Sequence, residues 1–149
     1  MKKLFLVLFI FVSGCGYQSI YLNNNPQNFE FFKITIEGQD DINRKITNSI
    51  SLKEDNSNKM LNELFLKTSF KINETSKDKK GRVKSYRSSI FVSLTIKNDV
   101  KIIKSKNFSE EFTYNTKENK FELVEYQTSV KDDLVNKVIE DIALFLNVQ

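Results

Sequence analysis

The sequence has no histidine and a single cysteine, Cys15, among its 149 residues. Without histidine there can be neither a histidine-dependent catalytic triad nor a histidine metal ligand. One cysteine cannot close a disulfide within the chain or build a zinc site of the Cys/His kind. The four glycines are too scattered to form a phosphate-binding loop. We therefore expect a protein that is not an enzyme and needs no metal or cofactor.

The first 14 residues have the pattern of a bacterial secretory signal. Lys2 and Lys3 are followed by an apolar run from Leu4 to Val12, and small residues stand directly before Cys15. As a helix this run would be about 13 Å long, which is too short for the ~30 Å hydrocarbon core of a membrane. Residues 1–14 are therefore predicted to be a cleaved signal and not a membrane span.

Cys15 falls where lipid would be attached. The segment from Val12 to Cys15, Val-Ser-Gly-Cys, resembles the lipobox of bacterial lipoproteins, in which the cysteine is acylated and becomes the first mature residue. An ordinary signal with an incidental cysteine is the alternative, but the only cysteine stands at the position that a lipobox requires. We expect acylated Cys15 to anchor the chain, because several acyl chains at ~0.8 kcal/mol per methylene hold a protein on a membrane effectively permanently.

The mature chain would have 135 residues, enough for one domain with a real core. Loss of Lys2 and Lys3 lowers the net charge from +4 to +2, so any preference for polyanions must come from local clustering. Residues 15–28 contain the only proline and show little periodicity, which is typical of an extended tether. Residues 29–149 are predicted to form the single domain.

Alternating apolar and polar residues predict four strands in this domain, at residues 29–37, 64–73, 83–97 and 100–115. The alternation of the second strand has one apparent slip at Thr68. Between the first two strands, Ile42, Ile46 and Ile50 recur every four residues, which predicts an amphipathic helix over 40–53. Residues 54–59 are too polar to pack and are expected to form a loop. In the fourth strand, Ile102 is assigned to the same apolar face as Phe108.

The longest helical pattern is C-terminal. A capping box at Ser129 would start this helix late, whereas Phe121 and Val124 favour a start near Lys117, which we adopt. Its apolar face is a row at spacing four with two flanking positions: Val130, Leu134, Val135, Val138, Ile139, Ile142 and Leu146. The predicted fold is α+β, a mostly antiparallel four-stranded sheet in the order strand, helix, three strands, helix, with two helices packed on one face.

The strongest local charge lies between the second and third strands. Six basic residues and one acidic residue fall between Lys77 and Arg87. A solvated hairpin tip is the simpler interpretation of such a run. The functional interpretation is an anion site, with phosphorylated lipid more plausible than nucleic acid for a secreted, lipid-anchored chain. The candidate contacts are Lys79, Lys80, Arg82, Lys84 and Arg87.

Several short motifs resemble the LPS-assembly lipoprotein family LptE, whose partner is the outer-membrane β-barrel LptD. They are Cys15-Gly16-Tyr17 with Ile20-Tyr21, Ile42 with Arg44, Tyr86-Arg87, and Phe112-Thr113-Tyr114-Asn115. The pattern departs from the family where Ser19-Ile20 replaces Pro-Leu and where Thr113 replaces Ser. The combination covers essentially the whole mature chain, and the predicted order of elements agrees with the family's sheet backed by two helices.

The resemblance implies a plug in the lumen of an LptD-like barrel, which helps the barrel assemble and helps move lipopolysaccharide to the cell surface. It also implies a place on the periplasmic face of the outer membrane, and Gly16 after the cysteine agrees with outer-membrane sorting. Two alternatives stay open. One is another small lipoprotein adaptor, such as a pilot protein of a secretion pore; the other is a periplasmic enzyme using serine or carboxylate chemistry, for which only the residue types are present.

Overall fold

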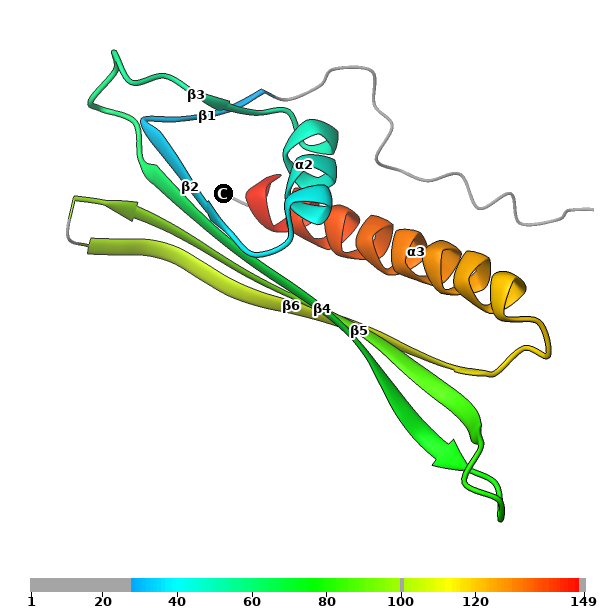
Figure 1. The fold of residues 1–149 in the computed structure, drawn as a ribbon. Coiled ribbons are helices and arrows are strands. Elements are labelled where there is room, and N and C mark those ends of the chain that lie inside the picture. Colours follow the sequence, from blue (N-terminus) through cyan, green and yellow to red (C-terminus); the bar gives the residue numbers. More distant parts are fainter. Residues whose placement is uncertain (1–27, 100, 148–149) are drawn as a thin grey trace, which may run out of the picture.

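The computed structural model describes residues 28–99 and 101–147, so the predicted signal, most of the tether and Cys15 lie outside the described residues. Two helices cover one face of a long, twisted sheet (Figure 1). In chain order the elements are β1 (Phe29–Phe31), β2 (Lys33–Glu37), α2 (Asp40–Ser49), β3 (Leu52–Glu54), β4 (Glu63–Lys77), β5 (Val83–Asn98), β6 (Lys101–Asn115) and α3 (Lys120–Asn147).

The main sheet has four strands in the order β2-β4-β5-β6. β2 runs parallel to β4, and the other two pairings are antiparallel. The α+β prediction, with a mostly antiparallel four-stranded sheet and two helices on one face, is therefore confirmed. A second, two-stranded parallel sheet of β1 and β3 was not predicted.

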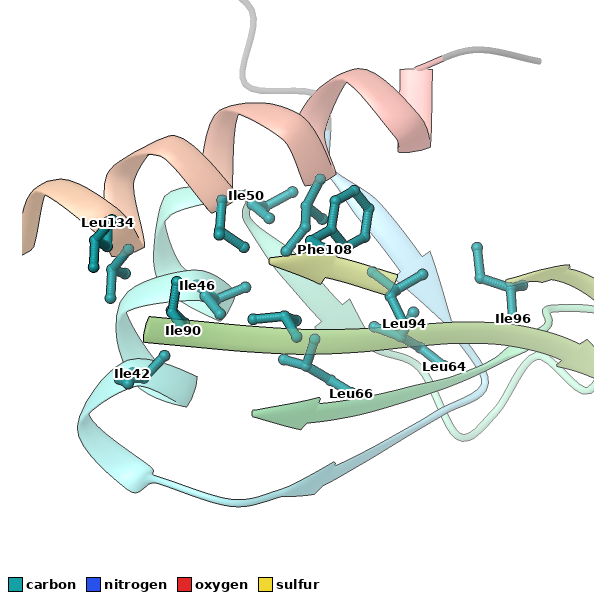
Figure 2. Packing of buried hydrophobic residues seen from close by; sticks show 14 of the residues in the cluster. Ile42, Ile46, Ile50, Leu64, Leu66, Ile90, Leu94, Ile96, Phe108 and Leu134 are labelled. Carbon is teal, nitrogen blue, oxygen red and sulfur yellow. The ribbon is translucent and has the colours of Figure 1, made fainter. Parts of the chain in front are cut away.

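The core lies between the sheet and the helices (Figure 2). On β5 every second residue from Ser88 to Ile96 is buried, as its one-sided pattern predicts. From the helix side, Ile42 and Ile46 of α2 and Leu134 of α3 are buried against these strands. The predicted period-four row of α3 is confirmed, because its buried residues are Val130, Leu134, Val135, Val138 and Ile142. Neither helix of the described part of the chain is long and apolar enough to cross a membrane.

Thr68 does not interrupt β4, and the predicted slip is wrong. Its side chain lies on the covered face and is only 3% exposed. The hydroxyl donates to Asn43 Oδ1 of α2 at 2.6 Å and accepts from the backbone N–H of Gln39 at 3.2 Å. Gly38 precedes these contacts with a φ of +108° and no room for a Cβ, because one would lie 2.0 Å from the Thr68 carbonyl oxygen. A polar residue therefore keeps its core position because α2 satisfies it.

Both predicted helix boundaries needed adjustment. The helix predicted over 40–53 ends at Ser49, and Ser51 takes a positive φ of 54°, so that the chain turns into β3. At the other helix, the Asn119 side chain accepts a hydrogen bond from the Phe121 N–H at 2.8 Å, which caps the start of α3. The early start that we adopted near Lys117 is therefore close to the observed one, and Ser129 lies inside the helix.

Two strands differ from their predicted forms. The strand predicted over 29–37 bends at Phe32, whose N–H donates to the carbonyl of Asn62 at 2.8 Å, and so divides into β1 and β2. The face predicted for Ile102 is wrong as well. A register shift between Ile96 and Lys97 places Ile102 opposite Lys97 on the open face, whereas Phe108 lies opposite buried Val92. One extra residue in a strand reverses the faces of those that follow.

A candidate anion-binding cleft beside the tip of the long hairpin

The β4–β5 hairpin projects away from the two helices (Figure 1). Its turn is closed by the Asp78 N–H, which donates to the Arg82 carbonyl at 2.8 Å, and by the Gly81 N–H, which donates to the Asp78 carbonyl at 3.0 Å. Gly81 has a φ of +78°, a conformation that glycine adopts without steric cost. The basic run of the sequence therefore does form a hairpin tip.

Asp78 organises this tip. Its carboxylate accepts hydrogen bonds from the backbone N–H groups of Lys80 and Arg82, at 2.8 and 2.9 Å, and from the Arg82 Nε at 2.7 Å. The backbone bond from Arg82 and then its side-chain bond hold the pKa of the Asp78 carboxyl below its usual range. Arg82 is consequently engaged by an acid of its own loop, whereas Lys79 and Lys80 extend into solvent.

A cleft of about 760 Å³ lies between the tip end of this hairpin and the start of α3. Pairing of Ser85 with Asn115 places the end of β6 beside the start of β5, and the Thr116 N–H donates to the Lys84 carbonyl at 2.8 Å. The cleft is lined by two acidic residues, Asp78 and Glu118, and by four basic residues: Arg82, Lys84, Lys117 and Lys120. The positive end of the α3 dipole adds to the attraction for anions.

The same cleft has an apolar side formed by Tyr86, Leu123 and Val124. Tyr86 stacks on Tyr114 with a centroid separation of 6.0 Å, and Tyr126 of α3 meets Tyr114 edge-on at 5.4 Å. Through these ring contacts Tyr114 and Tyr126 pack behind Tyr86, on the strand side of the cleft. On the first turns of α3, Val124 and the neighbouring Phe121 are 60% and 68% exposed.

Lysine and aromatic side chains meet at the margin of the cleft. Lys117 Nζ lies 4.6 Å from the centroid of the Tyr126 ring, a cation–π contact that fixes the position of this cation without neutralising it. A charged rim next to exposed apolar side chains suits an anionic amphiphile, with phosphates at the lysines and hydrocarbon against Leu123 and Val124.

The five residues predicted from the sequence do not converge on one site. Lys84 lines the cleft and Arg82 lies at its hairpin margin. Lys79 and Lys80 lie at the exposed tip. Arg87 points to the opposite face of the sheet, where its guanidinium donates to Thr113 Oγ1 at 3.2 Å and lies 3.8 Å from Glu111.

Sequence reasoning missed Lys117 and Lys120. They belong to no basic run, and only the register of β5 on β6 brings them beside Lys84. The one signal in the sequence was their position at the start of an amphipathic helix. A helix that covers a sheet places its first turn at one end of that sheet, where strand ends and turns also lie.

No protein-family model and no curated protein matches the chain. Solved structures match its fold. Rare lipoprotein B from Shewanella oneidensis is 13% identical over 74% of this chain and 89% of its own, with a TM-score of 0.56. Lipoprotein B from Nitrosomonas europaea is 11% identical over 85% and 88%, with a TM-score of 0.51. A neuraminyllactose-binding hemagglutinin homologue from Helicobacter pylori is 13% identical over 82% and 87%, also at 0.51. At such identities the likeness shows the fold alone.

Proposed function

We propose that this chain is an LptE-like outer-membrane lipoprotein. Lipid on Cys15 holds it on the periplasmic face, the domain plugs an LptD-like β-barrel and assists its assembly, and lipopolysaccharide is the ligand of the cleft. The fold shared with rare lipoprotein B supports the first part, together with the signal and lipobox pattern of residues 1–15.

The observation that carries the ligand assignment is the pairing of cations and apolar side chains in one cleft. Lipopolysaccharide offers phosphates and acyl chains on one molecule. Lys84, Lys117 and Lys120 supply charge-assisted donors, and exposed Val124 and Phe121 lie beside them on α3. A site for a free anion alone would not need this exposed apolar area.

A pilot-type adaptor of a secretion pore would share the anchor and the compact domain. The partner separates the two functions. We expect the acylated chain, isolated from detergent-solubilised membranes through a C-terminal tag, to bring down an LptD-like barrel in equimolar amount. Recovery of a secretion pore in place of the barrel would establish the adaptor function. If neither protein is recovered, both proposals are left without support.

A further inference from the structure

Exposed apolar side chains gather at the end of the main sheet that lies away from the anion-binding cleft. Ile102 and Ile103, at the start of β6, are 60% and 52% exposed, and Met60, in the connection before β4, is 92% exposed. The register shift between Ile96 and Lys97 makes Ile103 the extra residue of a bulge, which re-aims the side chains of this part of the strand. Exposed apolar side chains that gather in one place indicate a surface that meets a partner.

The chain enters the domain at this same end. One row of directly opposed residues crosses all four strands of the sheet here: Lys33, Glu63, Lys97 and Ile102. Neighbouring strands lie about 4.8 Å apart, so Ile102 is about 14 Å from Lys33 along this row. Figure 1 shows β1 and the start of β6 at one end of the sheet and the tip of the β4–β5 hairpin at the other.

The length of chain before the domain lets a lipid on Cys15 serve this end. Thirteen residue steps separate Cys15 from Asn28, and an extended chain of that length spans up to about 43 Å. β4 runs from Glu63 to Lys77, which carries the hairpin tip about 46 Å beyond the row that contains Ile102. The end with the exposed apolar side chains is therefore the end nearer to the anchored membrane.

Exposed lysines lie beside these apolar side chains. Lys97 pairs with Glu63 at 3.2 Å, whereas Lys33 and Lys101 are exposed to solvent. A lysine can lay its hydrocarbon stem along an apolar surface while its ammonium group reaches a lipid phosphate. Asp99 offsets one of these charges, so the apolar side chains supply most of the attraction to a membrane.

We propose that this end of the sheet docks on the phospholipid leaflet that holds the acyl chains of Cys15. Met60, Ile102 and Ile103 enter the interfacial region of the leaflet, and Lys33 and Lys101 contact anionic headgroups. Docking in this orientation leaves the anion-binding cleft accessible at the far end of the sheet. The inference rests on the proposed function only for the lipid anchor, and not for the barrel or for lipopolysaccharide.

The chain has no tryptophan, so one introduced tryptophan reports the depth of one position. Ile102→Trp and Met60→Trp place it at the docking end. Phe91→Trp is the matched control, since Phe91 is 42% exposed on the uncovered face of β5. Each acylated chain is reconstituted into vesicles of phosphatidylethanolamine and phosphatidylglycerol, with or without bromine on the lipid acyl chains. We expect brominated lipid to quench about half or more of the emission of the first two variants and little of the control.

A second arm tests the headgroup contacts. Lys33→Ser and Lys101→Ser, together in the Ile102→Trp chain, should reduce this quenching by about half at low salt, because attraction to anionic lipid is lost. Undiminished quenching would contradict these contacts. The thermal midpoint of each variant checks its folding, since all the replaced side chains are partly or fully exposed.

Two failures can be told apart. Equal emission of Ile102→Trp and Met60→Trp with and without bromine, or equal quenching of Phe91→Trp, overturns the inference and leaves the proposed function intact. A wild-type chain that takes up no palmitate and does not float with the vesicles overturns the lipid anchor, and this inference with it.

Discussion

The Asp78 carboxylate holds Arg82 at two points, its backbone N–H at 2.9 Å and its guanidinium Nε at 2.7 Å. These bonds lower the pKa of Asp78, so the ionised form is favoured in the folded tip. The ordering that they give is complete above the ordinary aspartate pKa of about 3.9 and is lost as the pH falls through the lowered value.

The tip should therefore stay ordered at neutral pH and loosen only in strong acid. Amide chemical shifts of Lys80 and Arg82, followed by NMR from about pH 6 to pH 2, should move together with a midpoint below the ordinary aspartate value. The Asp78→Asn variant should show no such titration. A midpoint at or above about 3.9 would contradict the role given to Asp78.

Thr68 and Asn43 join the sheet to α2 through a buried hydrogen bond of 2.6 Å. Thr68→Val keeps the shape of the side chain but leaves Asn43 Oδ1 and the Gln39 N–H without this partner. We expect a loss of about 1–3 kcal/mol in the free energy of unfolding, measured in urea. Thr68→Ser keeps the hydroxyl and should cost clearly less. A negligible loss for Thr68→Val, or a larger loss for Thr68→Ser than for Thr68→Val, would contradict the weight given to this hydrogen bond.

Gly38 and Gly81 both have positive φ, but only Gly38 is crowded. Gly81→Ala meets open space and should cost about 1 kcal/mol, the usual cost of a left-handed conformation for alanine. Gly38→Ala adds the clash with the Thr68 carbonyl oxygen, and we expect about 3 kcal/mol or more. Thermal unfolding of the two variants side by side measures the difference. Similar losses would mean that the β2–α2 connection relaxes around the new methyl group.

Anchoring depends on Cys15, which lies outside the described residues and stays a prediction from the sequence. Cys15→Ala should prevent acylation and processing by the lipoprotein route, because that route requires the thiol of the only cysteine. Cells labelled with radioactive palmitate should show label in the wild-type chain and none in the variant, which should accumulate as a precursor or be mislocalised. A variant that still takes up label and sediments with outer membrane would refute the lipobox assignment.

The parts of the fold that the sequence predicts well are those set by local periodicity. The alternation in β5 and the period-four row of α3 each define a buried face without reference to any partner. The misassigned positions depend on residues distant in sequence. Thr68 is buried because Asn43 satisfies it, and β1 separates from β2 because Phe32 bonds to Asn62.

The candidate site likewise has parts that local sequence predicts and parts that depend on long-range contacts. The charge run indicated the hairpin tip and Lys84. Strand alternation explains why Tyr86 lies on the face of the sheet that lines the cleft, whereas Arg87 lies on the opposite face. Lys117 and Lys120 could not be joined to Lys84 from the sequence, because the β5–β6 register that brings them together is a long-range property.

The central claim is that the cleft binds lipopolysaccharide through these lysines. Its most direct test replaces Lys84, Lys117 and Lys120 together with serine. The control replaces three exposed lysines that line no part of the cleft, Lys53, Lys59 and Lys137. A second arm replaces Lys79, Lys80 and Arg82, and should weaken binding less, because Arg82 already pairs with Asp78.

The decisive measurement is the dissociation constant for lipopolysaccharide at low and high salt, with the thermal midpoint of each variant as the check on folding. Charge-assisted bonds contribute about 1.5–3 kcal/mol each, so loss of the three cleft lysines should weaken binding at least tenfold after screening and reduce its salt dependence. The midpoint should hardly change, and the control should bind as wild type does. Wild-type affinity and salt dependence in the cleft variant would contradict the account.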